Sequence, residues 1–259
     1  MLHFDDVGPR TAPAIVLLHS LATHSELWAF QVPVWSAHFR VIRVDFPGHG
    51  RSAVSDQPMS LPDMAQAVVR VLDHLNIAQA AFVGLSLGGM VAQVAALAHA
   101  PRVAALVTAH AGARTDATVR EIWDQRIQQF EAGGLADLPH ATLARWFPRA
   151  FSEGSPITMA WMARLIGQTD PRGYVNAIRA IQNLDHLERL PEIAAPTLVI
   201  AGEADAAVPP AVASMVAQRI PQAELRLLAD TGHIGNVQNP TLFTEMVGQF
   251  LINTMETTT

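Results

Sequence analysis

The stretch FVGLSLGGM, residues Phe82 to Met90, places one serine between two glycines. An apolar run typical of a strand comes before the serine, and a segment typical of a helix follows it. The spacing of Gly84, Ser86 and Gly88 is that of the nucleophile elbow, a sharp strand-to-helix turn that exposes a serine hydroxyl at its tip. Glycine suits such a turn because it adopts backbone angles that a Cβ forbids. The same pattern also occurs in ordinary turns, so its meaning depends on the rest of the chain.

Composition limits the classes of protein to which this chain can belong. Its 259 residues are enough for one large domain with an insertion. Hydrophobic residues make up 50% of the chain and charged residues 15%, which is typical of a well-packed fold rather than a disordered chain. A net charge of −6 with 17 scattered basic residues gives no basic surface for nucleic acid. The absence of cysteine excludes disulfides, a thiol nucleophile and zinc–thiolate sites.

The sequence also predicts that the chain does not enter a membrane. No segment approaches 18 uninterrupted apolar residues, the length that would indicate a membrane span. The first ten residues contain Asp5 and Asp6 and lack the basic and then apolar pattern of a secretory leader. We therefore expect a cytoplasmic protein that acts on a small molecule, and the oligomeric state stays open.

Short apolar runs alternate with longer segments of helical period. This alternation predicts an α/β fold with a mostly parallel sheet, right-handed crossovers and helices on both faces. Ligands of such sheets gather at the carboxyl ends of the strands. The expected strands are 14–19, 41–45, 80–85, 103–109, 197–202 and 224–228, and the expected helices are 28–37, 61–75, 87–100, 211–220 and 242–253.

One long interval interrupts this alternation. Residues 114–194 contain no convincing buried strand but many helix-compatible pieces separated by glycine and proline. Because about 80 structureless residues are improbable inside a compact domain, we expect a helical cap there. The predicted organisation is a core formed by residues 1–113 and 195–259 with a cap formed by 114–194.

Residues that suit nucleophilic catalysis follow three of the expected strands. Ser86 follows the 80–85 strand, Asp205 follows 197–202, and His233 follows 224–228. A serine hydroxyl is a poor nucleophile until a base takes its proton, and a histidine base needs a carboxylate to fix its tautomer. The chain order of serine, acid and histidine is one that a known hydrolase architecture uses. We predict these three as the catalytic residues.

Other residues compete for the same roles. Glu203 is a weaker alternative to Asp205 as the acid. Asp230 is so near His233 in the chain that we expect it to tether the histidine loop instead. His110 directly follows the 103–109 strand and is a candidate to line the pocket, although it precedes the acid in chain order.

A hydrolase also needs donors for the oxyanion of its tetrahedral intermediate. The backbone N–H of Leu87 is one candidate, because the N–H groups at the start of a helix are unpaired and favour negative charge. The second candidate is the N–H of Leu21, in the turn after the first long apolar strand.

Motifs spread over the chain carry a family resemblance. LLHS, DFPGHGRS, GLSLGG, AGEADAAVPP and TGHIGN together resemble the α/β-hydrolase superfamily. A closer similarity, covering core and cap, is to the 3-oxoadipate enol-lactonase family, through GLSLGGMVAQ, RWFPRAFSEGSP, TDPRGYVNAIRAIQNLD and GHIGNVQNP. The resemblance implies the α/β-hydrolase fold and, within aromatic degradation, the opening of an unsaturated five-membered lactone. Ser86 would attack the carbonyl, an enolate would leave, and water activated by His233 would release the acid, without a metal or another cofactor.

Two loops depart from the pattern of that family. His19 and Ala22 replace the outer residues of an expected Asn-Ser-Leu-Gly, and Gly235 stands where serine is commoner. We expect both loops to border the acyl pocket, so the substrate stays open. A general carboxylesterase, a perhydrolase or a lactonase for another ring is an alternative, and so is a ligand-binding receptor of the same fold with slow turnover.

Three residues are predicted to contact the substrate. A lactone that carries a carboxylate is anionic, and arginine holds a carboxylate through two parallel hydrogen bonds. Arg145 is the candidate for this role, Trp146 would add an aromatic wall, and Ser20 lies in the turn that contains Leu21. The alternative is that Arg145 lies on a solvated helix face with Trp146 packed beneath it.

Overall fold

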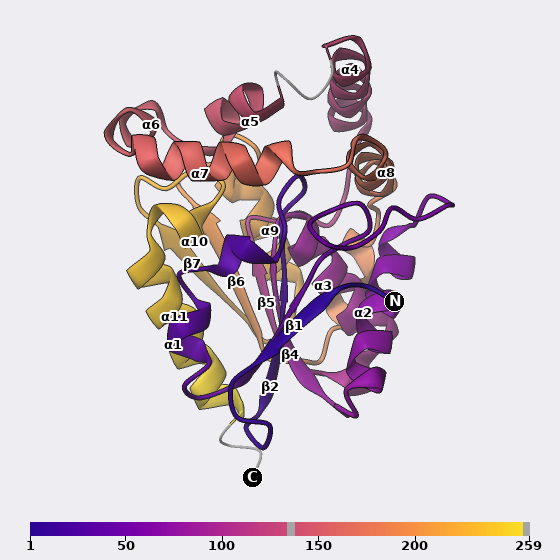
Figure 1. The fold of residues 1–259 in the computed structure, drawn as a ribbon. Coiled ribbons are helices and arrows are strands. Elements are labelled where there is room, and N and C mark those ends of the chain that lie inside the picture. The colour runs from indigo at the N-terminus through magenta and orange to yellow at the C-terminus, as the bar shows by residue number, and fades with distance from the viewer. Residues whose placement is uncertain (134–137, 256–259) are drawn as a thin grey trace.

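Within residues 1–133 and 138–255, seven strands form a single sheet, and helices cover both of its faces (Figure 1). The computed structural model describes residues 1–133 and 138–255. The strand order is β1-β3-β2-β4-β5-β6-β7; β1 is antiparallel to β3, and all other neighbours are parallel. The strands are β1 (Phe4–Val7), β2 (Ala14–Leu18), β3 (Arg40–Val44), β4 (Ala80–Leu85), β5 (Val103–Ala109), β6 (Thr197–Gly202) and β7 (Ala223–Leu228).

The helices that flank the sheet bury the central strands. In Figure 1 α1 and α11 lie against one face, and α2 and α3 lie against the other. Every residue of β2, β4 and β6 is buried, as parallel strands covered on both faces should be. The flanking helices are α1 (Val32–Trp35), α2 (Leu61–His74), α3 (Leu87–Ala98), α9 (Pro210–Arg219), α10 (Gly235–Gln238) and α11 (Pro240–Met255).

Most of the expected elements are confirmed, with two corrections. The helix expected over 28–37 is wrong: a 3₁₀ turn, η1 (Ser25–Trp28), comes before the single turn of α1. Pro33 has no N–H and belongs in the first turn of a helix, so no helix continues through it from Trp28. The second correction is β1, a four-residue edge strand with two aspartates and no apolar run, for which no strand is predicted.

Helices between β5 and β6 lie over the carboxyl ends of the parallel strands (Figure 1). They fill the described part of the interval for which a cap is predicted, and residues 134–137 of that interval lie outside the described residues. The division into a core and a cap at 114–194 stays our proposal. These elements are α4 (Ala117–Gly133), α5 (Leu138–Trp146), α6 (Arg149–Gly154), α7 (Pro156–Gly167), α8 (Pro171–Gln182) and the 3₁₀ segment η3 (Leu187–Glu192). In the described part of the chain, no helix has the length and apolar character needed to cross a membrane.

The turn between β4 and α3 packs backbone closely against backbone. Ser86 has φ 55° and ψ −114°, in the left-handed half of backbone space that non-glycine residues rarely enter. A Cβ on Gly84 would lie 2.1 Å from the carbonyl oxygen of Gly88, and one on Gly88 would lie 2.1 Å from that of Leu18. The two glycines therefore permit the backbone contacts that hold Ser86 in this conformation.

We predict that Gly84→Ala lowers the free energy of unfolding by about 3 kcal/mol, because the added methyl group meets backbone that cannot move aside. Gly167→Ala is the matched control, since a Cβ there has no atom within 4 Å. Its effect should stay below about 1 kcal/mol. Urea unfolding measures both variants, and wild-type stability in Gly84→Ala would contradict the close packing described above.

Candidate functional site

Side chains from three loops form one hydrogen-bonded chain. The Nε2 atom of His233 is 3.0 Å from the Ser86 hydroxyl, and its Nδ1 atom is 2.9 Å from Oδ2 of Asp205. Because an ionised carboxylate only accepts, the Nδ1–H of His233 donates to it, and Nε2 is left to accept from the Ser86 hydroxyl. The structure therefore brings together the three residues that the sequence selected. All three are buried.

Asp205 is held as an ion by several donors. Its Oδ1 accepts the backbone N–H groups of Ala207 and Val208, both at 2.8 Å. Burial alone would raise the pKa of Asp205, but the charge interaction with His233 and the hydrogen bonds from His110 and His233 outweigh it and hold the pKa below its ordinary value. The carboxylate is thus ready to stabilise a protonated His233.

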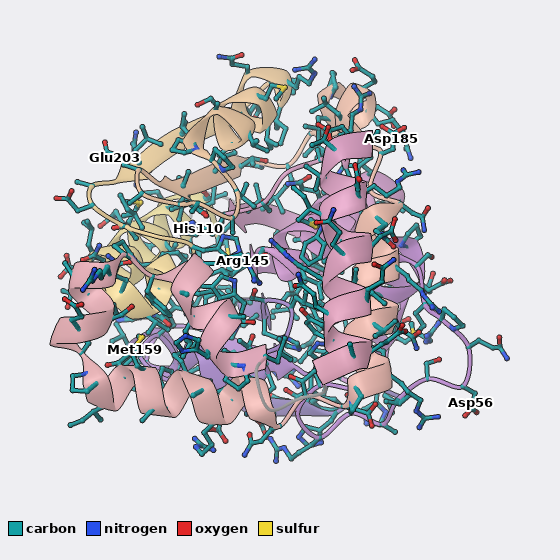
Figure 2. The ribbon with its side chains drawn as sticks, turned by 90° about the horizontal axis from the view of Figure 1, so that it is seen from above. Asp56, His110, Arg145, Met159, Asp185 and Glu203 are labelled. Carbon is teal, nitrogen blue, oxygen red and sulfur yellow. The ribbon has the colours of Figure 1, made fainter. Side chains whose placement is uncertain are left out.

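The two competing acids lie elsewhere. Glu203 is exposed, and Figure 2 shows it well away from His110 and Arg145. Asp230 is also exposed, and its backbone carbonyl, rather than its side chain, accepts a hydrogen bond from Gln238 at 2.8 Å. In the described residues neither side chain bonds to His233.

His110 occupies a place that the sequence did not predict. It does not line the cavity above Ser86; its Nδ1 atom lies 3.0 Å from Oδ2 of Asp205. Its ring meets that of His233 edge to face, with centroids 5.8 Å apart. The sequence signal for this contact is limited to the position of His110 directly after β5, because β5 lies beside β6, the strand that Asp205 follows.

The turn after β2 carries Leu21, one of the two expected oxyanion donors, and lines the same cavity as Ser86. Within the described residues, the N–H groups of Leu21 and Leu87 have no hydrogen-bond acceptor, so both are free to donate. The turn is held by His19, whose carbonyl accepts the N–H of Gly88 at 3.0 Å. The His19 ring donates from Nδ1 to the Ser20 carbonyl at 2.7 Å and accepts the Phe46 N–H at Nε2 at 2.9 Å.

A small cavity adjoins Ser86 and His233. The core contributes the Ser20 hydroxyl, which is buried without a hydrogen-bond partner in the described residues. Helix α5 contributes Trp146, whose carbonyl oxygen accepts the backbone N–H of His233 at 2.7 Å. The cavity is lined by Ser20, Leu21, Ala22, Ser86, Met90, Trp123, Arg126, Thr142, Arg145, Trp146, Tyr174, Ile181, Ala207, Val208 and His233.

Two half-buried arginines give this cavity a positive charge. Arg145 points to the middle of the molecule in Figure 2, and one of its guanidinium N–H groups donates to the Ala141 carbonyl at 3.2 Å. Arg126, which the sequence analysis missed, lies 4.4 Å over the ring of Trp123. Burial and the nearby charge of Arg145 lower the pKa of Arg126 to about 10. Neither arginine forms a salt bridge with a described residue, so the charge is free for a ligand.

Three atoms near Ser86 lie close enough to suggest a metal site. The ligand atoms of His110, Asp205 and His233 are within 4.8 Å of one another. However, the Nδ1 atoms of both histidines already point at Oδ2 of Asp205 at hydrogen-bond distance. This hydrogen bonding accounts for the cluster without an ion.

Several histidines are buried and neutral. Burial lowers the pKa of His19 to about 3 and the pKa values of His49 and His186 to about 4. His186 has a polar partner, because its Nε2 atom lies 2.7 Å from Oε1 of Gln93. Protonation of these rings at low pH must therefore favour the unfolded chain.

The chain is similar to known hydrolases over nearly its whole length. A family model described as the alpha/beta hydrolase fold matches residues 13–240. The 3-oxoadipate enol-lactonase 1 of Acinetobacter baylyi is 33% identical over 244 residues, which cover 94% of this chain and 90% of that protein. The crystal structure of the enol-lactonase from Burkholderia xenovorans LB400 superposes with a TM-score of 0.92 at 36% identity and covers 96% of both chains. A thermophilic esterase from Thermogutta terrifontis has a TM-score of 0.91 at 26% identity, over 98% of this chain and 93% of its own.

We predict that stability falls as the pH is lowered from about 6.5 toward 4. In this range the histidines of the unfolded chain become protonated, whereas the same histidines stay neutral in the folded protein. The free energy of unfolding therefore drops by up to about 1.4 kcal/mol per pH unit for each such histidine. His186→Gln should make this slope shallower by about 1 kcal/mol per pH unit. Urea unfolding at pH 7 and pH 5 measures the slope, with replacement of the exposed His38 as the control. An unchanged slope in His186→Gln would contradict the neutral form.

Proposed function

The chain belongs to the alpha/beta hydrolase fold family and is an enzyme of the carboxylic ester hydrolase class, and we propose that it opens a small enol-lactone bearing a carboxylate. The observation that carries this proposal is the hydrogen-bonded chain of Ser86, His233 and Asp205 beneath a cavity with two arginines that lack acidic partners. The enol-lactonase names of the relatives agree with it.

The first half of the proposed reaction forms an acyl-enzyme. The Ser86 oxygen attacks the lactone carbonyl while Nε2 of His233 takes the hydroxyl proton, and Asp205 stabilises the resulting imidazolium. The N–H groups of Leu21 and Leu87 donate to the oxyanion. Collapse of the intermediate breaks the ring C–O bond, and the departing enolate oxygen takes the proton from Nε2 of His233, which leaves the histidine neutral. The enolate is a good leaving group, so its departure requires little acid assistance from His233.

The second half restores the enzyme. His233 removes a proton from water, the hydroxide attacks the acyl carbonyl, and the Ser86 oxygen leaves and regains its proton. Ring opening therefore converts one ester bond into a new carboxylate and an enol. Every proton in this cycle passes through Nε2 of His233, so the proposal needs neither a metal nor another cofactor.

The cap supplies recognition in this proposal. Arg145, assisted by Arg126, takes the substrate carboxylate, because a half-buried guanidinium without an acidic partner forms strong charge-assisted hydrogen bonds. Trp146 provides the aromatic wall beside His233, with ring centroids 6.1 Å apart. The unpaired Ser20 hydroxyl is a further substrate contact.

Two other activities make different predictions. A general carboxylesterase, or a lactonase for a neutral ring, would not depend on the arginines. A ligand-binding receptor with slow turnover would bind lactones without releasing product at a useful rate. A panel of anionic and neutral lactones and esters, ranked by kcat/KM, separates these alternatives.

We predict that a fluorophosphonate probe labels Ser86 stoichiometrically and that His233→Ala nearly abolishes the labelling. Asp205→Asn should keep the fold and lower kcat by about 10⁴, because the histidine then adopts the wrong tautomer. Mass spectrometry of the intact protein and of its peptides reads the labelling. Undiminished labelling of Ser86→Ala would reject the nucleophile, and near-normal kcat in Asp205→Asn would reject the acid.

We predict that Arg145→Ala lowers kcat/KM for carboxylate-bearing lactones by about tenfold or more, the scale of one charged hydrogen bond. Neutral esters should be spared. Arg149→Ala is the matched control, because Arg149 is an exposed cap arginine already paired with Glu153. Equal losses of kcat/KM on anionic and neutral substrates would mean that Arg145 only supports the cap. No loss of kcat/KM would mean that its side chain does not contact the substrate carboxylate.

A further inference from the structure

His110 is a fully buried residue whose conformation is costly. It follows β5 directly and has φ 53°, in the left-handed region that favours glycine. Its backbone N–H donates to the carbonyl of Ile200 at 2.7 Å, which anchors it to the neighbouring strand β6. The ring Nδ1 atom lies 3.0 Å from Oδ2 of Asp205. A strained residue with a polar ring aimed at the acid points to a role in the site.

The Asp205 carboxylate has its full set of donors only when His110 is counted. Oδ1 accepts two backbone N–H groups, and Oδ2 accepts the Nδ1–H of His233. A carboxylate has about four acceptor positions, and the Nδ1–H of His110 fills the remaining one. Since Asp205 is ionised and only accepts, His110 carries its proton on Nδ1.

The other side of the His110 ring admits no second proton donor. In the described residues its Nε2 atom is buried without a hydrogen-bond partner. A Cβ on residue 235 would lie 2.6 Å from this nitrogen, so Gly235 leaves the space that the ring fills. This explains the glycine that departs from the enol-lactonase pattern: Gly235 accommodates His110 and is not part of the cavity lining.

We propose that His110 is a positioning residue of the hydrolytic site, which acts by sharing Oδ2 of Asp205 with His233. Its neutral ring fixes the carboxylate and, by donating to it, spreads the negative charge, so that Asp205 attracts the proton of His233 less strongly. The described titratable and charged groups around His110 are Asp205, His233 and Ser86, with Arg126 and Arg145 in the cavity above.

This inference rests on the proposed roles of Ser86, His233 and Asp205, and its test separates the two. The pH profile of kcat/KM is measured with a neutral p-nitrophenyl ester, which does not need the arginines. Ser86→Ala, tested first, must be inactive. Activity in that variant rejects the proposed function, whereas the pH profiles of the His110 variants test the role of His110 alone.

His110→Leu removes the donor and keeps an apolar side chain of similar size. We expect the midpoint of the acidic limb to move to higher pH by about half a unit to one unit, and kcat/KM at the optimum to fall about tenfold. His110→Asn carries an amide N–H at the position of Nδ1, so it should return the midpoint toward wild type. His186→Gln is the matched control, a buried histidine bonded to Gln93 instead of Asp205. A loss in His110→Leu with an unmoved midpoint, or no recovery in His110→Asn, overturns the proposal.

A second measurement holds even where His110→Leu fails to fold. In wild-type protein with ¹⁵N-labelled histidine, the NMR shifts of His110 should report protonated Nδ1 and unprotonated Nε2 between pH 5 and 8. Gly235→Ala assigns the signal, because the Cβ of the added methyl group would lie 2.6 Å from Nε2 of this ring. A proton on Nε2, or titration of the ring within that range, overturns the proposal.

Discussion

The left-handed backbone of Ser86 is the constraint on which the rest of the site depends. Two glycines allow β4 and α3 to meet backbone to backbone, and the turn is then tied to both neighbouring strands. The Ser86 N–H donates to the carbonyl of Ala109 at the end of β5, and the Gly88 N–H donates to that of His19 after β2. The same few hydrogen bonds therefore place the serine, the loop that carries Leu21 and the residue that precedes His110.

Charge is arranged in two layers around this turn. Below it, the negative charge of Asp205 is fully satisfied by two backbone N–H groups and two imidazoles. Above it, Arg126 and Arg145 carry positive charge with no acidic partner in the described residues. An ionised acid on one side of His233 and a cationic cavity on the other suit the proposed reaction, which creates an oxyanion and then a carboxylate. The carbonyl of Trp146 links the layers by accepting the N–H of His233.

The sequence predicts those parts of the site that local chemistry determines. Ser86 has a glycine pattern, Asp205 follows an apolar strand and His233 follows the last strand-like run, so topology brings the three near one another. Arg126 has no such signal, because one of several arginines on a cap helix becomes part of the site only through packing. The contact between His110 and Asp205 could not be predicted either, because no local sequence pattern indicates that the His110 ring reaches the Asp205 carboxylate. β1 was missed because pairing with β3, not an apolar run, makes it a strand.

In the proposed reaction Ser86 forms an ester with the acyl part of an anionic substrate. The most direct test is rapid-quench mass spectrometry during turnover of the mono-p-nitrophenyl ester of a short dicarboxylic acid. We expect a burst of one p-nitrophenol per active site and an acyl adduct on the peptide that contains Ser86. Both should be absent in Ser86→Ala. Hydrolysis that proceeds with no burst and no adduct, or an adduct on another residue, would contradict it.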